Sequence, residues 1–192
     1  MNGDHWYLYT ADYAEPTDET TKETALEIMM HHLTPAAASK FYRKEGVADQ
    51  DKFPGIAELI PGQDTDEFNF NPCGYSMNGL MDDVYSTIHV TPEVHCSYAS
   101  FETNWNLTTY KRLIAHVFDV FQPGTVTLSL FADASSRSMD LVEIPGYIMT
   151  HKTHSELSSD RDVMLIQYES LTHHNRRNST TRRGQIRVPI SE

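Results

Sequence analysis

The sequence contains one long polar and aromatic stretch, which reads FNFNPCGYSMNG over residues 68–79, STIHVTPE over 86–93 and SYASFETN over 97–104. Small, polar and aromatic residues stand here where an ordinary core strand carries Val and Ile. Polar and apolar side chains alternate in the second and third segments, which is typical of strands with two different faces. We therefore predict that these segments form neighbouring strands of the central sheet.

The same segments carry most of the side chains suited to chemistry. Ser76 supplies a hydroxyl, His89 an imidazole, and Glu93 and Glu102 two carboxylates. Phe70 stands just before a Pro-Cys-Gly bend, where an aromatic face can be presented to a ligand. A plainer interpretation of Ser76 and His89 is a strand pair with one satisfied polar contact. For Phe70 it is an ordinary place in the core.

Periodicity predicts the other elements of the fold. We expect helices over 20–33, 35–44 and 109–121, a helical turn over 54–60, and strands over 6–13, 126–132, 141–149 and 163–168. The first helix is predicted because apolar residues recur at helical spacing, at Leu26, Met29, Met30 and Leu33. Asn106 or Thr108 is the expected cap of the last helix. Helices separated by runs of hairpin-like strands indicate an α+β fold, with an antiparallel β-sheet and helices packed on one face.

Length and charge set the broad class. The 192 residues suffice for one domain with a hydrophobic core, which we assign to 1–170. The net charge of −12 argues against general nucleic-acid binding. Residues 171–192 hold five arginines and one acid, or +4, which leaves −16 for the rest. This basic tail is rich in Asn, Ser, Thr and Arg, and that composition predicts disorder.

Cysteine, histidine and hydropathy patterns bear on the cellular compartment and on metal binding. Two cysteines, Cys73 and Cys96, make no disulfide framework, and we interpret Cys73 as a small buried thiol in a tight bend. No apolar run approaches the roughly 20 residues that span a bilayer, and the first residues do not read as a signal peptide. We expect a cytoplasmic protein without membrane contact. Ten histidines show no metal-ligand spacing, so no metal is expected.

The motifs at 70–79, 87–93 and 97–104 resemble those of the eukaryotic S-adenosylmethionine decarboxylases. These are pyruvoyl-dependent enzymes of polyamine biosynthesis that supply spermidine and spermine synthesis. Supporting matches follow in family order, at 6–10, 26–28, 59–62 and 121–124. The resemblance covers only the C-terminal half of the family's proenzyme, and Met1 stands where the family has an internal methionine.

This resemblance implies half of a four-layer α/β/β/α sandwich. The family stacks two sheets face to face, so we expect the uncovered face of this chain's sheet to be apolar. Exposing such a face costs about 25 cal/mol per Å². We therefore expect the chain to pair with itself or with a decarboxylase N-terminal half.

The resemblance also implies roles for particular residues in binding and self-processing. Ser76 and His89 match family residues that assist the autocatalytic cleavage. Phe70 matches an aromatic residue that stacks on the adenine of S-adenosylmethionine, and Glu93 matches the carboxylate that holds the ribose hydroxyls. Val94 begins a segment that departs from the family pattern, which puts the shape of this loop in question.

Glu27 and Glu102 match acids near the putrescine that activates some members. Glu23 and Ala25 depart from the family residues there, which weakens the case for putrescine activation. The plain alternative for Glu27 is a solvated helix face.

The family makes its pyruvoyl group from a serine, by cleaving a Glu-Ser bond in the earlier half of the proenzyme. The Glu-Ser pair in this sequence is Glu169-Ser170, which lies outside every family motif and which we interpret as a coincidence. Three hypotheses remain open. The chain is a decarboxylase portion that lacks the pyruvoyl-forming serine and is inactive alone, a non-catalytic half-enzyme paralogue that binds or regulates a full-length decarboxylase, or a non-functional truncated product.

Overall fold

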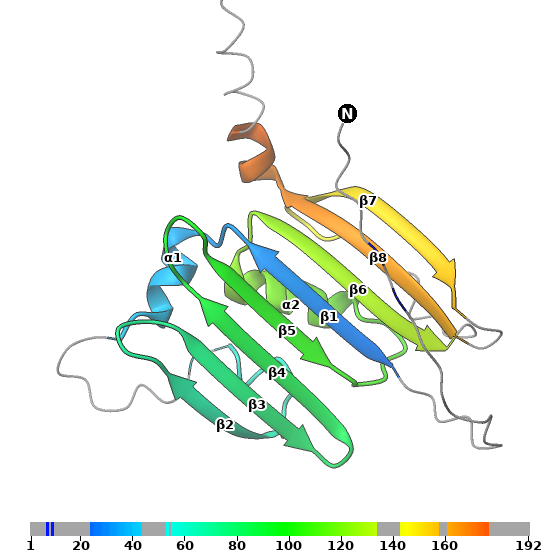
Figure 1. Ribbon diagram of the computed structural model, residues 1–192, viewed down its shortest axis with the longest axis horizontal. Helices are drawn as coiled ribbons and strands as arrows, with labels where there is room; N and C mark the ends of the chain where they lie inside the picture. The colour runs from blue at the N-terminus through cyan, green and yellow to red at the C-terminus, as the bar shows by residue number, and fades with distance from the viewer. Residues whose placement is uncertain are drawn as a thin grey trace, which may run out of the picture.

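The computed structural model describes residues 24–43, 53, 55–133, 143–157 and 161–176, together with Tyr7 and Tyr9. Within these residues eight strands form one antiparallel sheet in the order β2-β3-β4-β5-β1-β6-β8-β7 (Figure 1). The strands are β1 (Ala25–His31), β2 (Asp64–Asn69), β3 (Tyr75–Met81), β4 (Val84–Thr91), β5 (Tyr98–Thr103), β6 (Thr125–Asp133), β7 (Tyr147–Glu156) and β8 (Arg161–Ser170).

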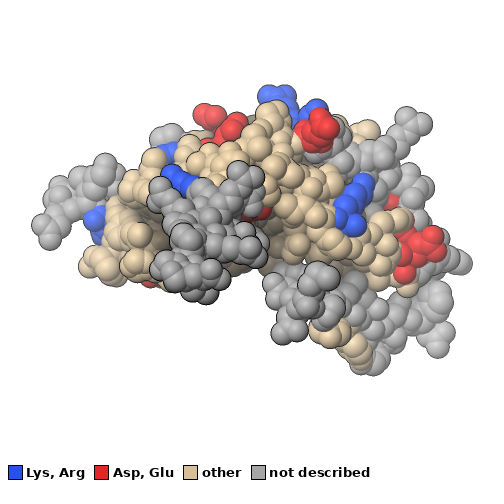
Figure 2. Space-filling model, turned by 90° about the horizontal axis from the view of Figure 1, so that it is seen from above, with Lys and Arg blue, Asp and Glu red and all other residues tan. Residues whose placement is uncertain are grey.

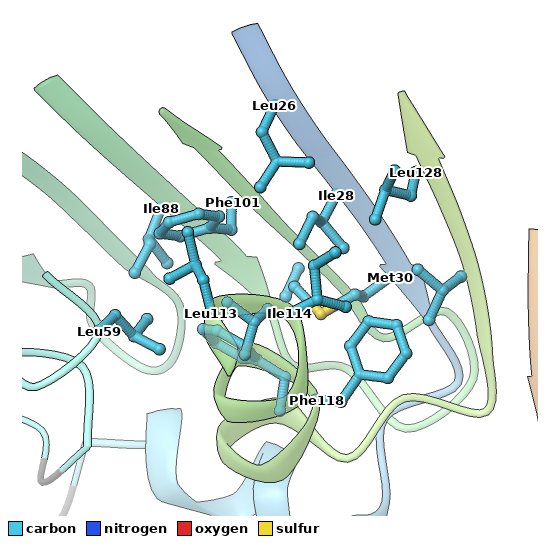
Figure 3. Close-up of a cluster of buried hydrophobic side chains, with 14 of the residues drawn as sticks. Leu26, Ile28, Met30, Leu59, Ile88, Phe101, Leu113, Ile114, Phe118 and Leu128 are labelled. Atoms are coloured by element: carbon cyan, nitrogen blue, oxygen red, sulfur yellow. The ribbon is translucent and has the colours of Figure 1, made fainter. Parts of the chain in front are cut away.

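One face of the sheet is covered by α2 (Lys111–Phe121), which lies behind the strands in the view of Figure 1. The apolar stripe of α2 includes Leu113, Ile114 and Phe118, and all three side chains are buried. Ile28 and Phe101 come from two central strands and belong to the same core, as Figure 3 shows. Each such side chain contributes roughly 1.5–3 kcal/mol by leaving water. The predicted α+β class, with helices on one face of an antiparallel sheet, is confirmed.

The opposite face of the sheet is mostly polar, so the prediction of an apolar face is wrong. Alternation along β4 and β5 places Thr87, His89, Ser100 and Glu102 on this open face. Met29 is one of its few large apolar side chains in the middle of the sheet. The face tolerates polar groups because they bond to one another across strands, as the site described below illustrates.

The predicted helix over 20–33 is also wrong where the structure describes it. Ala25–His31 is strand β1, which pairs with β5 on one side and β6 on the other. Leu26, Ile28 and Met30 are fully buried at a spacing of two, while the residues between them are half-buried. Leu26 and Met30 also fit a helical spacing, which explains the error. Hydrogen bonding on both edges favours the strand.

Other helix and strand boundaries differ from the predicted ones, because local contacts determine where each element begins. The predicted helix over 35–44 is two short pieces, α1 (Pro35–Ala38) and η1 (Ser39–Phe41). Neither Asn106 nor Thr108 caps α2, which begins after Tyr110. The buried Tyr110 hydroxyl donates to the Trp105 carbonyl. The strand expected over 141–149 begins only at Tyr147, after a glycine with φ of 84°. The predicted strands over 126–132 and 163–168 are confirmed. Residues 55–60, the described part of the helical turn expected over 54–60, form a turn and a bend without a helix, held by bonds from the Ile56 amide to the Phe53 carbonyl and from the Leu59 amide to the Ile56 carbonyl.

The start of the predicted disordered tail is ordered. Residues 171–176 are helical, and the Leu171 amide donates to the Gly146 carbonyl. His173 and His174 both bind the buried Glu169 carboxylate through Nδ1, at 3.0 and 2.9 Å. These bonds hold the helical turn against the sheet, so disorder is the wrong description for these six residues. Residues 177–192, and most of the strand expected over 6–13, lie outside the described residues.

Charge is distributed without large patches on one side of the molecule. Figure 2 shows Lys and Arg interspersed with Asp and Glu over the described part of the side seen from above. No helix in the described part of the chain is long and apolar enough to cross a membrane.

Candidate functional site

A tight bend between β2 and β3 positions Phe70. The Phe70 amide donates to the Gly74 carbonyl at 2.9 Å, and the Gly74 amide donates to the Phe41 carbonyl at 3.0 Å. Gly74 has a φ of 111°, a conformation that favours glycine. A Cβ at Gly74 would lie 3.5 Å from the Phe70 ring and 3.4 Å from the Val90 carbonyl oxygen. The bend therefore lets the Phe70 ring lie directly over backbone.

Ser76 and His89 form a cross-strand pair. They are directly opposite each other in the β3–β4 register, and Ser76 Oγ lies 2.9 Å from His89 Nδ1. Both side chains lie on the open face, because their neighbours Tyr75 and Ile88 point into the core. A hydroxyl and an imidazole at this distance can exchange a proton. Sequence reasoning named both residues, and the structure brings them together.

A pocket of about 330 Å³ opens beside this pair. Its size lies at the lower end of the range for small-molecule sites. Phe70, Ser76, His89 and Glu93 all line it, although they come from two strands and from the segments flanking them. Four of the six candidate site residues are thus gathered around one cavity.

Cys73 also lines this pocket, and its surroundings keep it neutral. Burial raises the pKa of the Cys73 thiol, and the nearby Glu93 carboxylate raises it further. Both effects disfavour the thiolate, which is the nucleophilic form. Cys73 lies in the tight bend as interpreted, but its side chain is half-buried rather than buried.

The other two candidates, Glu27 and Glu102, form a second group on the open face. They are directly opposite each other in the β1–β5 register and do not line the pocket. The Tyr85 hydroxyl donates to Glu102 Oε1 at 2.5 Å, and Ser129 Oγ lies 3.5 Å from Glu27 Oε2. The hydrogen bond to Glu102, followed by burial, raises the pKa of Tyr85 to about 12. Tyr85 therefore stays protonated and donates to Glu102 throughout the neutral range.

Sequence reasoning missed two residues that support these groups. Tyr85 was not linked to Glu102, and Phe68 was not linked to Phe70, whose ring it meets edge-to-face at 4.8 Å. The alternation that places Thr87 and His89 on one face carries a signal for Tyr85. Its partner becomes clear only when the strand register is known.

Two features of the described residues bear on a metal or a pyruvoyl group. Within the described ranges, no three His, Cys, Asp or Glu side chains are placed to hold a metal ion. A pyruvoyl precursor requires a cleavable serine near groups that assist cleavage. Ser170 does not meet this requirement, because it is paired with Tyr147 in the β7–β8 ladder and its amide donates to Gly124.

Distance gives the same result for Glu169-Ser170. Strand β8 lies four strand steps from β4, which carries His89. At about 4.8 Å per step, that is roughly 19 Å across the sheet. Glu169 is itself buried and bound by two histidines. The Glu-Ser pair of this chain therefore does not fit a pyruvoyl group.

The fold and the site together define an α+β protein with a small polar pocket on the open face of an antiparallel sheet. Residues 1–169 match the family model of adenosylmethionine decarboxylase, so the chain belongs to that family. It is 43% identical to an S-adenosylmethionine decarboxylase proenzyme of Dictyostelium discoideum over 179 residues, which cover 89% of this chain and 47% of the relative.

Two further comparisons give a similar result. The chain is 47% identical to a proenzyme of the same name from Xenopus laevis over 140 residues, which cover 71% of this chain and 42% of the relative. The crystal structure of a Trypanosoma brucei AdoMetDC-delta26 monomer is 27% identical, with a TM-score of 0.66 over 77% of this chain and 65% of that one. The chain thus spans about half the length of the curated relatives that it matches.

Proposed function

We propose that this chain is the C-terminal portion of an S-adenosylmethionine decarboxylase of polyamine biosynthesis. The observation that carries the proposal is the shared pocket of Phe70, Ser76, His89 and Glu93. The resemblance assigns each of these residues a role, in self-processing for Ser76 and His89 and in substrate binding for Phe70 and Glu93. If the resemblance were a coincidence, residues from separate motifs would not be expected to line the same cavity.

The chemistry of the pocket supports the proposed binding of S-adenosylmethionine. The Phe70 ring, 44% exposed, offers a face on which the adenine can stack. The Glu93 carboxylate can accept hydrogen bonds from both ribose hydroxyls, and such charge-assisted bonds are about twice as strong as neutral ones. These two contacts would fix the nucleoside beside Ser76 and His89.

Ser76 and His89 act as a proton-transfer pair in this proposal. With the Ser76 hydroxyl donating to His89 Nδ1, the imidazole can take that proton and later return it. In the family this pair assists the cleavage that creates the pyruvoyl group. That group supplies the electron sink which decarboxylation of an amino acid requires.

We further propose that the 192 residues do not decarboxylate alone. Glu169-Ser170 is paired within the sheet and lies roughly 19 Å from β4, so it does not serve as the processing bond. A serine from an N-terminal half must come to the pocket. The polar open face is where we expect that half, or a second copy of the chain, to pack.

The Glu27–Glu102 pair is proposed as a diamine site. Directly opposed carboxylates repel each other, and a dication such as putrescine relieves that repulsion. Ala25 and Glu23 depart from the family pattern nearby, so the affinity is expected to be low.

The test is release of CO₂ from carboxyl-labelled S-adenosylmethionine. The chain is assayed alone and mixed with a separately produced N-terminal half of the Dictyostelium relative, with the Ser76→Ala chain as a matched control. We expect release only from the mixture with the unaltered chain. Release by the chain alone would refute the proposed dependence.

The second candidate function is a non-catalytic half-enzyme paralogue, which the misfit of Glu169-Ser170 favours. Adding the chain to a full-length relative separates the two. A regulator changes the turnover of the full-length enzyme and yields no activity with an isolated half.

A further inference from the structure

Phe68 is a large apolar side chain in a place where burial does not explain it. It lies on the outermost strand β2 with 60% of its surface exposed. Its ring meets that of Phe70 at a centroid distance of 4.8 Å and an interplanar angle of 70°. Edge-to-face contacts of this kind add stabilisation beyond area burial.

The strand register places Phe68 beside the reacting groups as well. Phe68 is directly opposite Ser76 in the β2–β3 pairing, and Ser76 is directly opposite His89. Phe68, Ser76 and His89 therefore form one row across three strands on the open face. Phe68 is nevertheless not among the residues that line the pocket. Any effect it has on a ligand passes through its neighbours.

We propose that Phe68 is a positioning residue that holds the Phe70 ring in the pocket wall, so that the pocket selects a planar heteroaromatic ring. Backbone hydrogen bonds fix where Phe70 begins, since its amide donates to Gly74, but they leave its side-chain torsions free. Gly74 has no side chain to limit the ring from beneath. The contact with the Phe68 ring supplies the missing restraint.

This proposal deepens the proposed function and rests on it for the identity of the ligand, the adenine of S-adenosylmethionine. The restraint itself belongs to the ligand-free chain and can be measured there. The two parts are therefore separable by experiment.

The first measurement is NMR on the chain with ¹³C-labelled phenylalanine rings. In the unaltered chain we expect ring-to-ring NOEs between Phe68 and Phe70 and Phe70 shifts displaced by the Phe68 ring current. Phe68→Ala and Phe68→Leu should move the Phe70 shifts toward those of a freely rotating ring, and Phe68→Tyr should restore them. Leu80→Ala is the matched control, because Leu80 is 63% exposed on the same face and has no part in the pocket.

The second measurement is a titration of the chain mixed with the N-terminal half of the Dictyostelium relative. The ligands are S-adenosylmethionine and methionine, which lacks the ring. We expect Phe68→Ala to weaken S-adenosylmethionine binding roughly three- to tenfold, in line with the worth of such ring pairs. Methionine binding and the Leu80→Ala variant should be unaffected. A structural role alone would shift both ligands together.

Unchanged Phe70 shifts in Phe68→Ala would overturn the proposal. The proposal is also overturned if Phe68→Ala and Phe68→Leu weaken pairing of the chain equally while the Phe70 ring does not move. Phe68 would then be an interface residue. If the Phe70 ring moves as expected but the chain with its N-terminal half binds no S-adenosylmethionine, the proposed function fails and the positioning role stands.

Discussion

Replacing Glu27 with glutamine should stabilise the chain, although most substitutions of half-buried residues destabilise. Glu27 is directly opposite Glu102 on neighbouring strands, and such residues have Cβ atoms about 4.5–5.5 Å apart. Two carboxylates about 6 Å apart repel by roughly 0.7 kcal/mol at a dielectric constant of 80 and 2.8 kcal/mol at 20. Both are partly exposed, so we expect a gain of about 1 kcal/mol for Glu27→Gln.

Little opposes this gain. The recorded side-chain hydrogen bond of Glu27 is the 3.5 Å contact with Ser129, at the limit of hydrogen-bond geometry. Glu102 keeps its hydrogen bond from Tyr85. Urea unfolding near neutral pH measures the difference, with Glu58→Gln as the control, because Glu58 is exposed on the turn over 55–59.

Salt and diamine give two further readouts. The Debye length falls to about 3 Å in 1 M salt, so the advantage of Glu27→Gln should shrink there. Putrescine at ten times its Kd should stabilise the unaltered chain by about 1.4 kcal/mol and stabilise Glu27→Gln much less. The reasoning is refuted if Glu27→Gln is no more stable than Glu58→Gln, or if putrescine stabilises both equally.

Three other predictions concern the core, the Tyr85 bond and the bend. Phe101→Ala should cost about 3–5 kcal/mol in urea unfolding, because Phe101 is fully buried in the central strand β5. Folding raises the pKa of Tyr85 from 10.0 to about 12, so the Tyr85 hydrogen bond stabilises the fold fully below pH 10 and this stabilisation is lost as the pH rises through 12. The lower free energy of unfolding of Tyr85→Phe should therefore approach that of the unaltered chain over this interval. Gly74→Ala should cost about 1–3 kcal/mol, since φ is 111° there, and should displace the Phe70 ring in NMR spectra.

Alternation was a useful guide to the central strands. Ile88 and Val90, and likewise Ala99 and Phe101, recur at a spacing of two with polar residues between them, and these strands formed as predicted. In α2 the buried apolar residues recur at helical spacing, and that helix formed too. Residues 25–31 fit both periods, because Leu26 and Met30 are compatible with either. Pairing on both edges decided that segment, and pairing is not visible in a local pattern.

The candidate site also combines residues that the sequence predicts with contacts that it does not. The motifs identified Phe70, Ser76, His89 and Glu93 as candidates, and the structure gathers them around one pocket. The supporting contacts of Phe68 with Phe70 and of Tyr85 with Glu102 depend on which strand lies beside which. Register is a tertiary property, so a single sequence could suggest the reacting groups but not the residues that hold them.

The polar open face has a consequence for how a partner would bind. An apolar face would bind almost any apolar surface, whereas a face bearing Ser76, His89, Glu27 and Glu102 penalises a partner that leaves those groups unpaired. Cross-strand bonds within the chain already satisfy one side of Ser76, His89 and Glu102. If the proposed N-terminal half packs on this face, it must match the remaining donors and acceptors, and that requirement separates it from non-specific association. Affinity for that half should then fall more in Glu102→Ala, which removes an acceptor, than in Leu80→Ala, which removes apolar area alone.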